Sequence, residues 1–269
     1  MRDFVRLLIA AAIAALPASA AAQAANANSA LMTRLGANYY SLKRLGFGGA
    51  RCRVTPDWTV VLGQPRSNPQ FQTAFTLLDQ LQFVLAIDSE AGIKLDKKDT
   101  GTGHTAQQTA SIQQIFAGLD QELGGFFSTW SLFMIQPPTP APSQADLVVA
   151  PQPGGYRLSY KDGHSEVRME TNRAGEISHL AVSAVRFISA IDPTFVHDPA
   201  GLVLTHYVAD YLPASGPGKA HLVVDISYQT VGGLKTPDVI RISTIYDGTT
   251  ANSAVTLSEC QVTRSLPSH

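Results

Sequence analysis

The sequence predicts an α+β protein in which one curved antiparallel sheet carries helices packed on one side. Three observations predict this class. Apolar residues recur at the helical spacing of three and four through much of residues 30–135. Prolines concentrate in the connector at residues 136–154, which is stiff and extended. From residue 155 to 264 apolar and polar residues alternate with a period of two, as half-buried strands do. We therefore expect a helical part followed by a sheet.

The chain begins with the pattern of a secretory signal peptide, which we assign to residues 1–24. A basic start precedes about ten apolar residues, and a stretch rich in alanine follows. Cleavage is expected after Ala22 or Ala24, which would leave the mature protein in the periplasm or secreted. The alternative is an uncleaved membrane anchor, for which about ten apolar residues are too few to span ~30 Å of hydrocarbon. Residues 25–269 then suit a single domain.

Two amphipathic helices are expected in the first part of the mature chain. The first covers residues 30–46, where one stripe is apolar and Gly46 ends the helix. A short strand at residues 51–54 follows it. The second covers residues 70–87, in which Phe and Leu recur at steps of three and four.

A third helix is predicted from about residue 105 to 127, with a possible extension to residue 134. Its apolar stripe is long, and Gly124-Gly125 interrupts it. Because each glycine weakens a helix interior by roughly 1 kcal/mol relative to alanine, we expect a kink or a break there.

Strands are expected throughout the last part of the chain. A Lys161-Asp162-Gly163-His164 turn and an Asp247-Gly248 turn each connect two alternating segments, which is a strong hairpin signal. The predicted strands are residues 156–161, 165–172, 176–187, 202–211, 220–230, 239–246 and 252–264.

Charge and cysteine content limit the possible functions. Lys and Arg number 20 against 21 Asp and Glu, a net charge of −1, which gives no electrostatic footprint for nucleic acid or an anionic lipid surface. We do not expect this chain to be an integral membrane protein. The two cysteines, Cys52 and Cys260, suggest one disulfide in an oxidising compartment. The alternative is two separate buried thiols.

Motifs for catalysis, metal binding or cofactor binding are missing from the sequence. No Gly-x-Ser-x-Gly elbow is present, and no two histidines have the spacing of a helical zinc site. His206 and His221 lie on neighbouring predicted strands, and His197-Asp198 is expected in a loop. Asp96 and Asp99 are interpreted as parts of a polar turn. We therefore expect no enzyme, no cofactor and no metal site.

The end of the third predicted helix is apolar on nearly all sides. Residues 126–135 contain two phenylalanines, a tryptophan, a further phenylalanine and a methionine, and prolines follow. Such side chains fill irregular apolar space without needing polar partners. The segment is either deeply buried core or the lining of a cavity for an apolar ligand.

Part of the sheet region resembles a known family. Tyr228-Gln-Thr-Val-Gly-Gly-Leu-Lys-Thr-Pro237, followed by Asp238-Val-Ile-Arg-Ile, resembles a strand–turn–strand signature of the periplasmic lipoprotein-localisation carriers, the LolA-like proteins. The resemblance covers roughly residues 156–263. It implies a half-open antiparallel barrel that helices close over an apolar cavity. This chain departs from the family in placing a large helical block first, and no arginine can be assigned to guard the cavity.

The same resemblance bears on the cysteines. Family-like architecture lets the first strand, with Cys52, lie beside the last, with Cys260, so that one disulfide joins them. By loop entropy such a bond would stabilise the protein by up to about 5 kcal/mol.

The function expected from these observations is non-catalytic binding of a lipid or acyl chain. The alternative is a structural or partner-binding envelope protein with a filled core and no ligand. The residues predicted to line the cavity are Phe116, Phe126, Phe127, Trp130, Phe133, Met134 and Tyr228.

Overall fold

The structure is a computed structural model, and it describes residues 16–89, 92–213 and 218–265. Its helices are α2 (Leu16–Ala37), α3 (Trp58–Leu62), the 3-10 turn η1 (Pro69–Phe71), α4 (Gln72–Leu78) and α5 (Ala106–Met134). Its strands are β1 (Phe47–Pro56), β2 (Leu81–Asp88), β3 (Gly92–Asp99), β4 (Val148–Gln152), β5 (Gly155–Asp162), β6 (Ser165–Asn172), β7 (Ile177–Ser183), β8 (Phe187–Asp198), β9 (Gly201–Pro213), β10 (Ala220–Val231), β11 (Leu234–Tyr246) and β12 (Thr249–Arg264).

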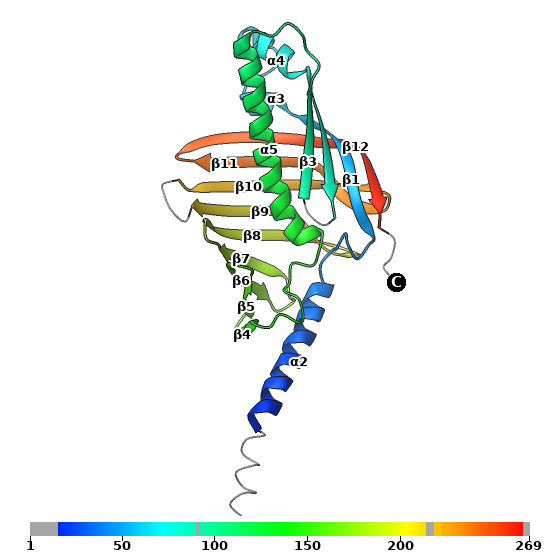
Figure 1. Cartoon of the computed structure of the whole chain (residues 1–269), viewed down its shortest axis with the longest axis vertical. Coiled ribbons are helices and arrows are strands. Elements are labelled where there is room, and N and C mark those ends of the chain that lie inside the picture. The colour runs from blue at the N-terminus through cyan, green and yellow to red at the C-terminus, as the bar shows by residue number, and fades with distance from the viewer. Residues whose placement is uncertain (1–15, 90–91, 214–217, 266–269) are drawn as a thin grey trace, which may run out of the picture.

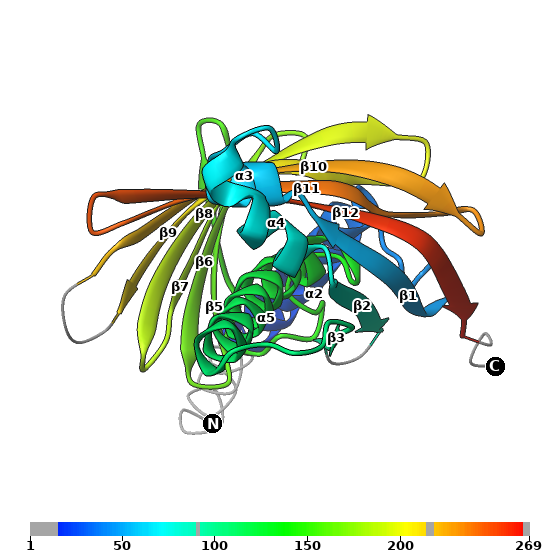
Figure 2. The ribbon, with the colours of Figure 1, turned by 90° about the horizontal axis from the view of Figure 1, so that it is seen from above.

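One twelve-stranded sheet dominates the fold. Its order is β3-β2-β1-β12-β11-β10-β9-β8-β7-β6-β5-β4, and every neighbouring pair is antiparallel. The sheet curves around α5, which lies on its concave face, while β3 and β4 remain as open edges (Figure 2). Figure 1 shows α5 crossing the strands from the α3 and α4 end of the molecule toward α2. The antiparallel sheet was predicted, but it contains more of the chain's residues than expected for an α+β protein with a helical first part.

The division into a helical first part and a stranded second part is wrong. Strands β1, β2 and β3 all lie within residues 47–99, and β4 lies within the predicted connector. The first three strands are hydrogen-bonded to each other in sequence order, and β1 pairs antiparallel with the last strand, β12. Strands from both ends of the chain therefore belong to one sheet.

The predicted second helix, residues 70–87, is a short helix followed by a strand. Leu78, Leu81 and Leu85 satisfy a helical spacing, but Leu81, Phe83, Leu85 and Ile87 also satisfy a period of two. The alternating residues of β2 are the buried ones, so the strand periodicity is the one the fold uses. The next segment, β3, is a lysine-containing edge strand and not a polar turn.

The first predicted helix, residues 30–46, ends earlier in the chain than expected. Helix α2 ends at Ala37, and Tyr39 pairs instead with Leu202 in an isolated β-bridge. The side chains of Leu35, Tyr39 and Leu42 are nevertheless buried, as their common stripe predicts. Burial was therefore predicted better than the position at which the helix ends.

The predicted strand at residues 176–187 corresponds to β7, and β8, which begins at Phe187, was not predicted. Chain direction reverses between β7 and β8, and β8 then continues to Asp198, so His197 and Asp198 are the end of a strand and not a loop. Pro193 and several polar residues hide the alternation of β8 in the sequence.

Helix α5 runs through Gly124-Gly125 as one 29-residue helix, so the expected break is absent from it. Its first turn is held by a capping box in which Thr105 accepts from the Gln108 backbone while the Gln108 side chain accepts from the Thr105 backbone. Burial of its apolar face against the sheet offsets the low helix propensity of the two glycines.

Most of the predicted signal peptide, residues 1–15, lies outside the described residues. Helix α2 crosses the expected cleavage positions after Ala22 and Ala24. Among the described helices, none combines the length and the apolar character that crossing a membrane requires.

The predicted disulfide joins Cys52 to Cys260, with the two Cα atoms 4.1 Å apart and a sequence separation of 208. Strand β1 pairs with β12, as the family resemblance implied. The register shifts between Arg51 and Arg53, where β12 carries the extra residue of a bulge. Glu259 at this bulge has a φ of 52°. A disulfide of this kind is typical of proteins in an extracellular or periplasmic compartment.

Removal of this disulfide should destabilise the protein markedly. We expect the double substitution Cys52→Ser and Cys260→Ser to lower the free energy of unfolding by about 2–5 kcal/mol, because the bond closes a very long loop in the unfolded chain. Denaturant unfolding of the variant and of reduced and oxidised wild type measures this. Peptide mapping without reductant that recovers the two cysteines in unlinked peptides would contradict the assignment.

Candidate ligand-binding groove

A groove of about 810 Å³ lies between α5 and the concave face of the sheet. Strands β9 to β12 form its floor, and α3 and α4 close one end. Its volume falls within the range of about 300–1,000 Å³ that small-molecule sites occupy. Most of the lining is apolar, with the main contributions from Trp58, Leu62, Leu77, Leu78, Ile115, Leu119, Phe126, Leu222 and Ile242.

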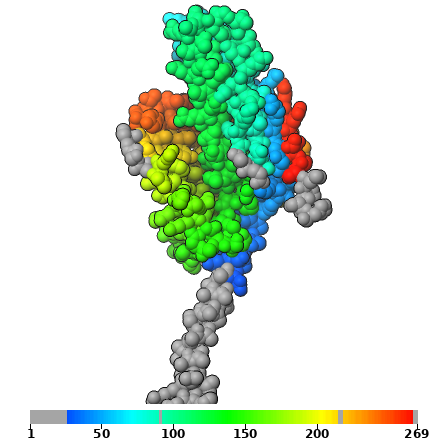
Figure 3. Space-filling model, viewed as in Figure 1, coloured from blue at the N-terminus to red at the C-terminus, as the bar shows by residue number. Residues whose placement is uncertain are grey.

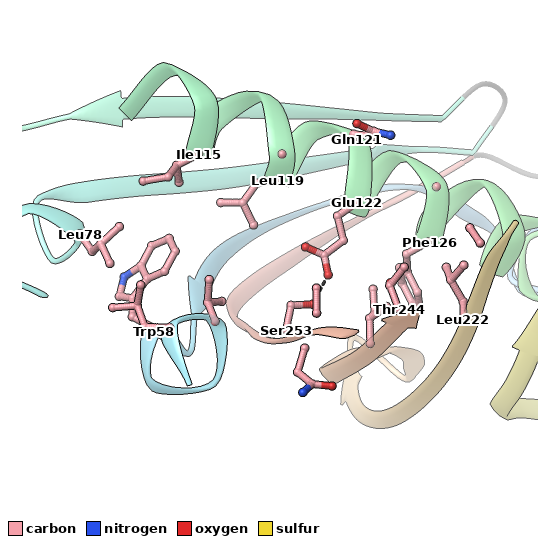
Figure 4. A pocket seen from close by; sticks show the side chains of 18 of the residues that line it. Trp58, Leu78, Ile115, Leu119, Gln121, Glu122, Phe126, Leu222, Thr244 and Ser253 are labelled. Carbon is pink, nitrogen blue, oxygen red and sulfur yellow. Dashed lines mark hydrogen bonds between the residues drawn. The ribbon is translucent and has the colours of Figure 1, made fainter. Parts of the chain in front are cut away.

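Each wall of the groove follows from local sequence. Helix α3 begins directly after β1, where the Asp57 side chain caps it by accepting from the backbone of Thr59 and Val60. The Asp57 backbone also donates to the carbonyl of Ala254 on β12, which fixes α3 to the floor. Trp58 is consequently held at the closed end of the groove, where it is buried (Figure 4).

Helix α5 presents different surfaces along its length. Its middle, including Ile115, Leu119 and Phe126, faces the groove. Its outer side remains at the surface between the two wings of the sheet (Figure 3). Beyond Phe126 the helix is packed into the core, where Trp130, Phe133 and Met134 have no exposed surface.

Of the seven residues predicted to line a cavity, Phe126 lines this groove. Phe116 is partly buried and packs edge to face against Phe83 of β2, with ring centroids 5.7 Å apart. Four others occupy filled core beside the groove: Phe127, Trp130, Phe133 and Met134. Tyr228 is partly buried and packs against this core.

Trp130 and Tyr228 form a hydrogen-bonded pair at the edge of that core. The indole Nε1 of Trp130 donates to the Tyr228 hydroxyl at 3.0 Å, and this hydroxyl donates to the carbonyl of Leu204 at 2.6 Å. Burial raises the pKa of Tyr228, so the phenol stays neutral. Both aromatic side chains thus have structural partners, and their role here is packing.

Glu122 is the single charged side chain among the described residues that line the groove. It points from α5 toward β12, where the hydroxyl of Ser253 donates to its Oε1 (Figure 4). Burial raises the pKa of the Glu122 carboxyl, and the hydrogen bond from Ser253 opposes this rise. Within the described chain, the second carboxylate oxygen has no hydrogen-bond partner.

Glu122 is not among the residues predicted to line a cavity, although the sequence carries a signal for it. Glu122 follows Leu119 by three residues and precedes Phe126 by four, so it lies on the apolar stripe of α5. The other missed residues, such as Trp58 and Ser253, are brought together only by the pairing of distant strands.

Histidines on the sheet pair with aspartates on the adjacent strand. His206 contacts Asp225 and His221 contacts Asp210, each at 2.8 Å, so the two histidines do not form a joint site. No cluster of three His, Cys, Asp or Glu side chains suited to a metal ion occurs in the part of the chain that the structure describes.

Comparison with known proteins finds no matching family profile, no matching curated protein and no matching solved structure. The function must therefore be inferred from the groove itself.

Truncation of Trp130 tests the assignment of this residue to filled core. We expect Trp130→Ala to lower the free energy of unfolding by about 3–5 kcal/mol, because it opens a cavity and removes the partner of Tyr228. Leu132→Ala, at an exposed position on the same helix, is the control and should change stability by only about 0.5 kcal/mol. Equal losses for the two variants in denaturant unfolding would contradict the assignment.

Neutralising Glu122 should stabilise the protein in a pH-dependent way. Its raised pKa means that the folded state favours the protonated form, so the wild type gains stability as pH falls and loses it as pH rises through the folded pKa. We expect Glu122→Gln to melt higher than wild type at neutral pH. The difference should vanish below the ordinary carboxyl pKa of 4.5. Glu166→Gln, at an exposed position, should show no such trend.

Proposed function

We propose that this protein is an exported, LolA-like binding protein that holds a lipid or acyl chain non-catalytically in the groove beneath α5. The observation that carries the proposal is an 810 Å³ groove with a mainly apolar lining and a single charged lining residue among those described. An apolar cleft of this size is favourable for long hydrocarbon groups, since burying each CH₂ contributes about 0.8 kcal/mol. The antiparallel sheet curved around a helix supports the family proposal.

Two glycines of α5 support a binding role for the groove. Gly118 and Gly125, two turns apart on one face of the helix, both line it. No described neighbour lies within 4 Å of the position a Cβ would take at either residue. Packing inside the protein therefore does not require glycine there, although each glycine costs the helix roughly 1 kcal/mol relative to alanine. Their absent side chains leave room along the helix for an occupant.

The proposed location outside the cytoplasm is supported by the disulfide and by the pattern of residues 1–24. In that compartment a groove that shields apolar chains from water would let a protein carry or store a lipid.

A partner-binding role is the second candidate, and one surface favours it. Large apolar side chains are exposed toward one end of strands β8, β9 and β11, and three of them share one face of the sheet, as a protein interface requires: Ile188, Leu212 and Ile245. This role does not need an accessible groove. Failure of all apolar probes to bind would leave it as the better proposal.

Filling the groove should abolish ligand binding without unfolding the protein. We expect Gly118→Leu and Gly125→Leu to weaken binding of a naphthylamine fluorescent probe by tenfold or more, because the new side chains enter the groove. Gly124→Leu is the matched control, since Gly124 has open space around its Cβ position but does not line the groove. Melting temperatures should stay at or above that of wild type.

Native mass spectrometry of the protein purified from its own cells identifies what the groove holds. A bound lipid that is present in wild type and lost in Gly125→Leu would support the proposal. An empty wild-type protein that also fails to bind the fluorescent probe would refute it.

A further inference from the structure

The groove is divided by polar groups near its middle. Figure 4 shows Trp58, Leu78 and Leu119 on one side of Glu122, and Phe126 and Leu222 on the other. The Glu122 carboxyl and the Ser253 hydroxyl meet between these two apolar regions. A ligand that fills both regions must therefore place its own middle against Glu122.

The free oxygen of Glu122 decides which chemical group fits there. Ser253 uses only Oε1, and Oε2 has no hydrogen-bond partner among the described residues. Oε2 is not fully buried, so water can reach it in the absence of a ligand. A ligand that fills the groove displaces this water, so one that supplies an N–H or O–H there gains a charge-assisted hydrogen bond. A ligand that places only ether or carbonyl oxygens there brings two acceptors together and pays for their desolvation.

We propose that the groove selects ligands in which a neutral hydrogen-bond donor, such as a secondary amide, lies between two apolar arms, with Glu122 accepting from that donor. The inference rests on the proposed function, because it concerns the same groove. It adds a specificity-determining residue and a ligand class: acyl amides, in preference to esters of the same shape.

The raised pKa of Glu122 is consistent with this arrangement. Burial makes the charged form costly, and a donor from the ligand would stabilise it. Among the described lining residues the other titratable groups are Tyr207 and Tyr211, whose pKa values are also raised by burial. Both phenols are therefore neutral, and no cation in the lining competes for the carboxylate.

A matched pair of probes tests the inference. N-octyl octanamide and octyl octanoate have nearly the same shape, but only the amide carries a donor at its centre. Each is delivered from cyclodextrin, and its affinity is measured by displacement of the fluorescent naphthylamine probe. We expect Glu122→Leu to lower the ratio of amide to ester affinity by about tenfold relative to wild type, which corresponds to one hydrogen bond to a charged group. Comparing ratios cancels the intrinsic difference in hydration of the two probes.

Thr244→Val is the matched control, since Thr244 is a polar side chain of the same groove, and it should leave the ratio unchanged. Should Glu122→Leu fail to fold, Glu122→Gln replaces it, because the amide removes the charge while keeping an acceptor for Ser253. An identical ratio in wild type and in the folded Glu122 variant would overturn the inference while leaving the proposed function intact. Failure of wild type to bind either probe would overturn both.

Discussion

The pairing of β1 with β12 is the interaction on which the rest of the structure depends. It joins the first three strands to the last nine in one sheet, and the Cys52–Cys260 disulfide fixes it covalently. Because α3 follows β1 without a loop, this pairing also places Trp58 at the end of the groove. Loss of this contact would separate the wall made by α3 and α4 from the floor made by β9 to β12. The disulfide therefore stabilises the groove as well as the fold.

Helix α5 serves two purposes at different points along its length. Its last turns bury Trp130, Phe133 and Met134, with Trp130 hydrogen-bonded to Tyr228, and they anchor the helix in the core. Its middle turns carry Gly118 and Gly125, and the groove separates them from the sheet. Rigid anchoring at one end allows the middle of a helix to remain over an open groove without collapse, because a core at near-crystalline packing density resists movement.

Glu122 is the least expected component of the groove. Its neighbours along the helix face are apolar, and burial without full hydrogen bonding is unfavourable for a carboxylate. The folded protein tolerates it because Ser253 satisfies one oxygen. In the function proposed for the groove, the ligand explains a charged residue that lowers stability in a mainly apolar lining, in keeping with the trade between stability and function in binding sites.

The sequence by itself determined the hairpins at residues 161–164 and 247–248, the existence of the long helix α5 and the presence of a disulfide, because each depends on local periodicity, turn residues or cysteine number. It did not determine β2, since Leu81 and Leu85 satisfy both the helical and the strand period, and only pairing with β1 decides between them. Nor could it separate core from groove along residues 126–134, because buried aromatic side chains look alike in both settings. Tertiary structure made that choice by packing Trp130 against the sheet while α3, α4 and the middle of α5 enclosed open space around Glu122.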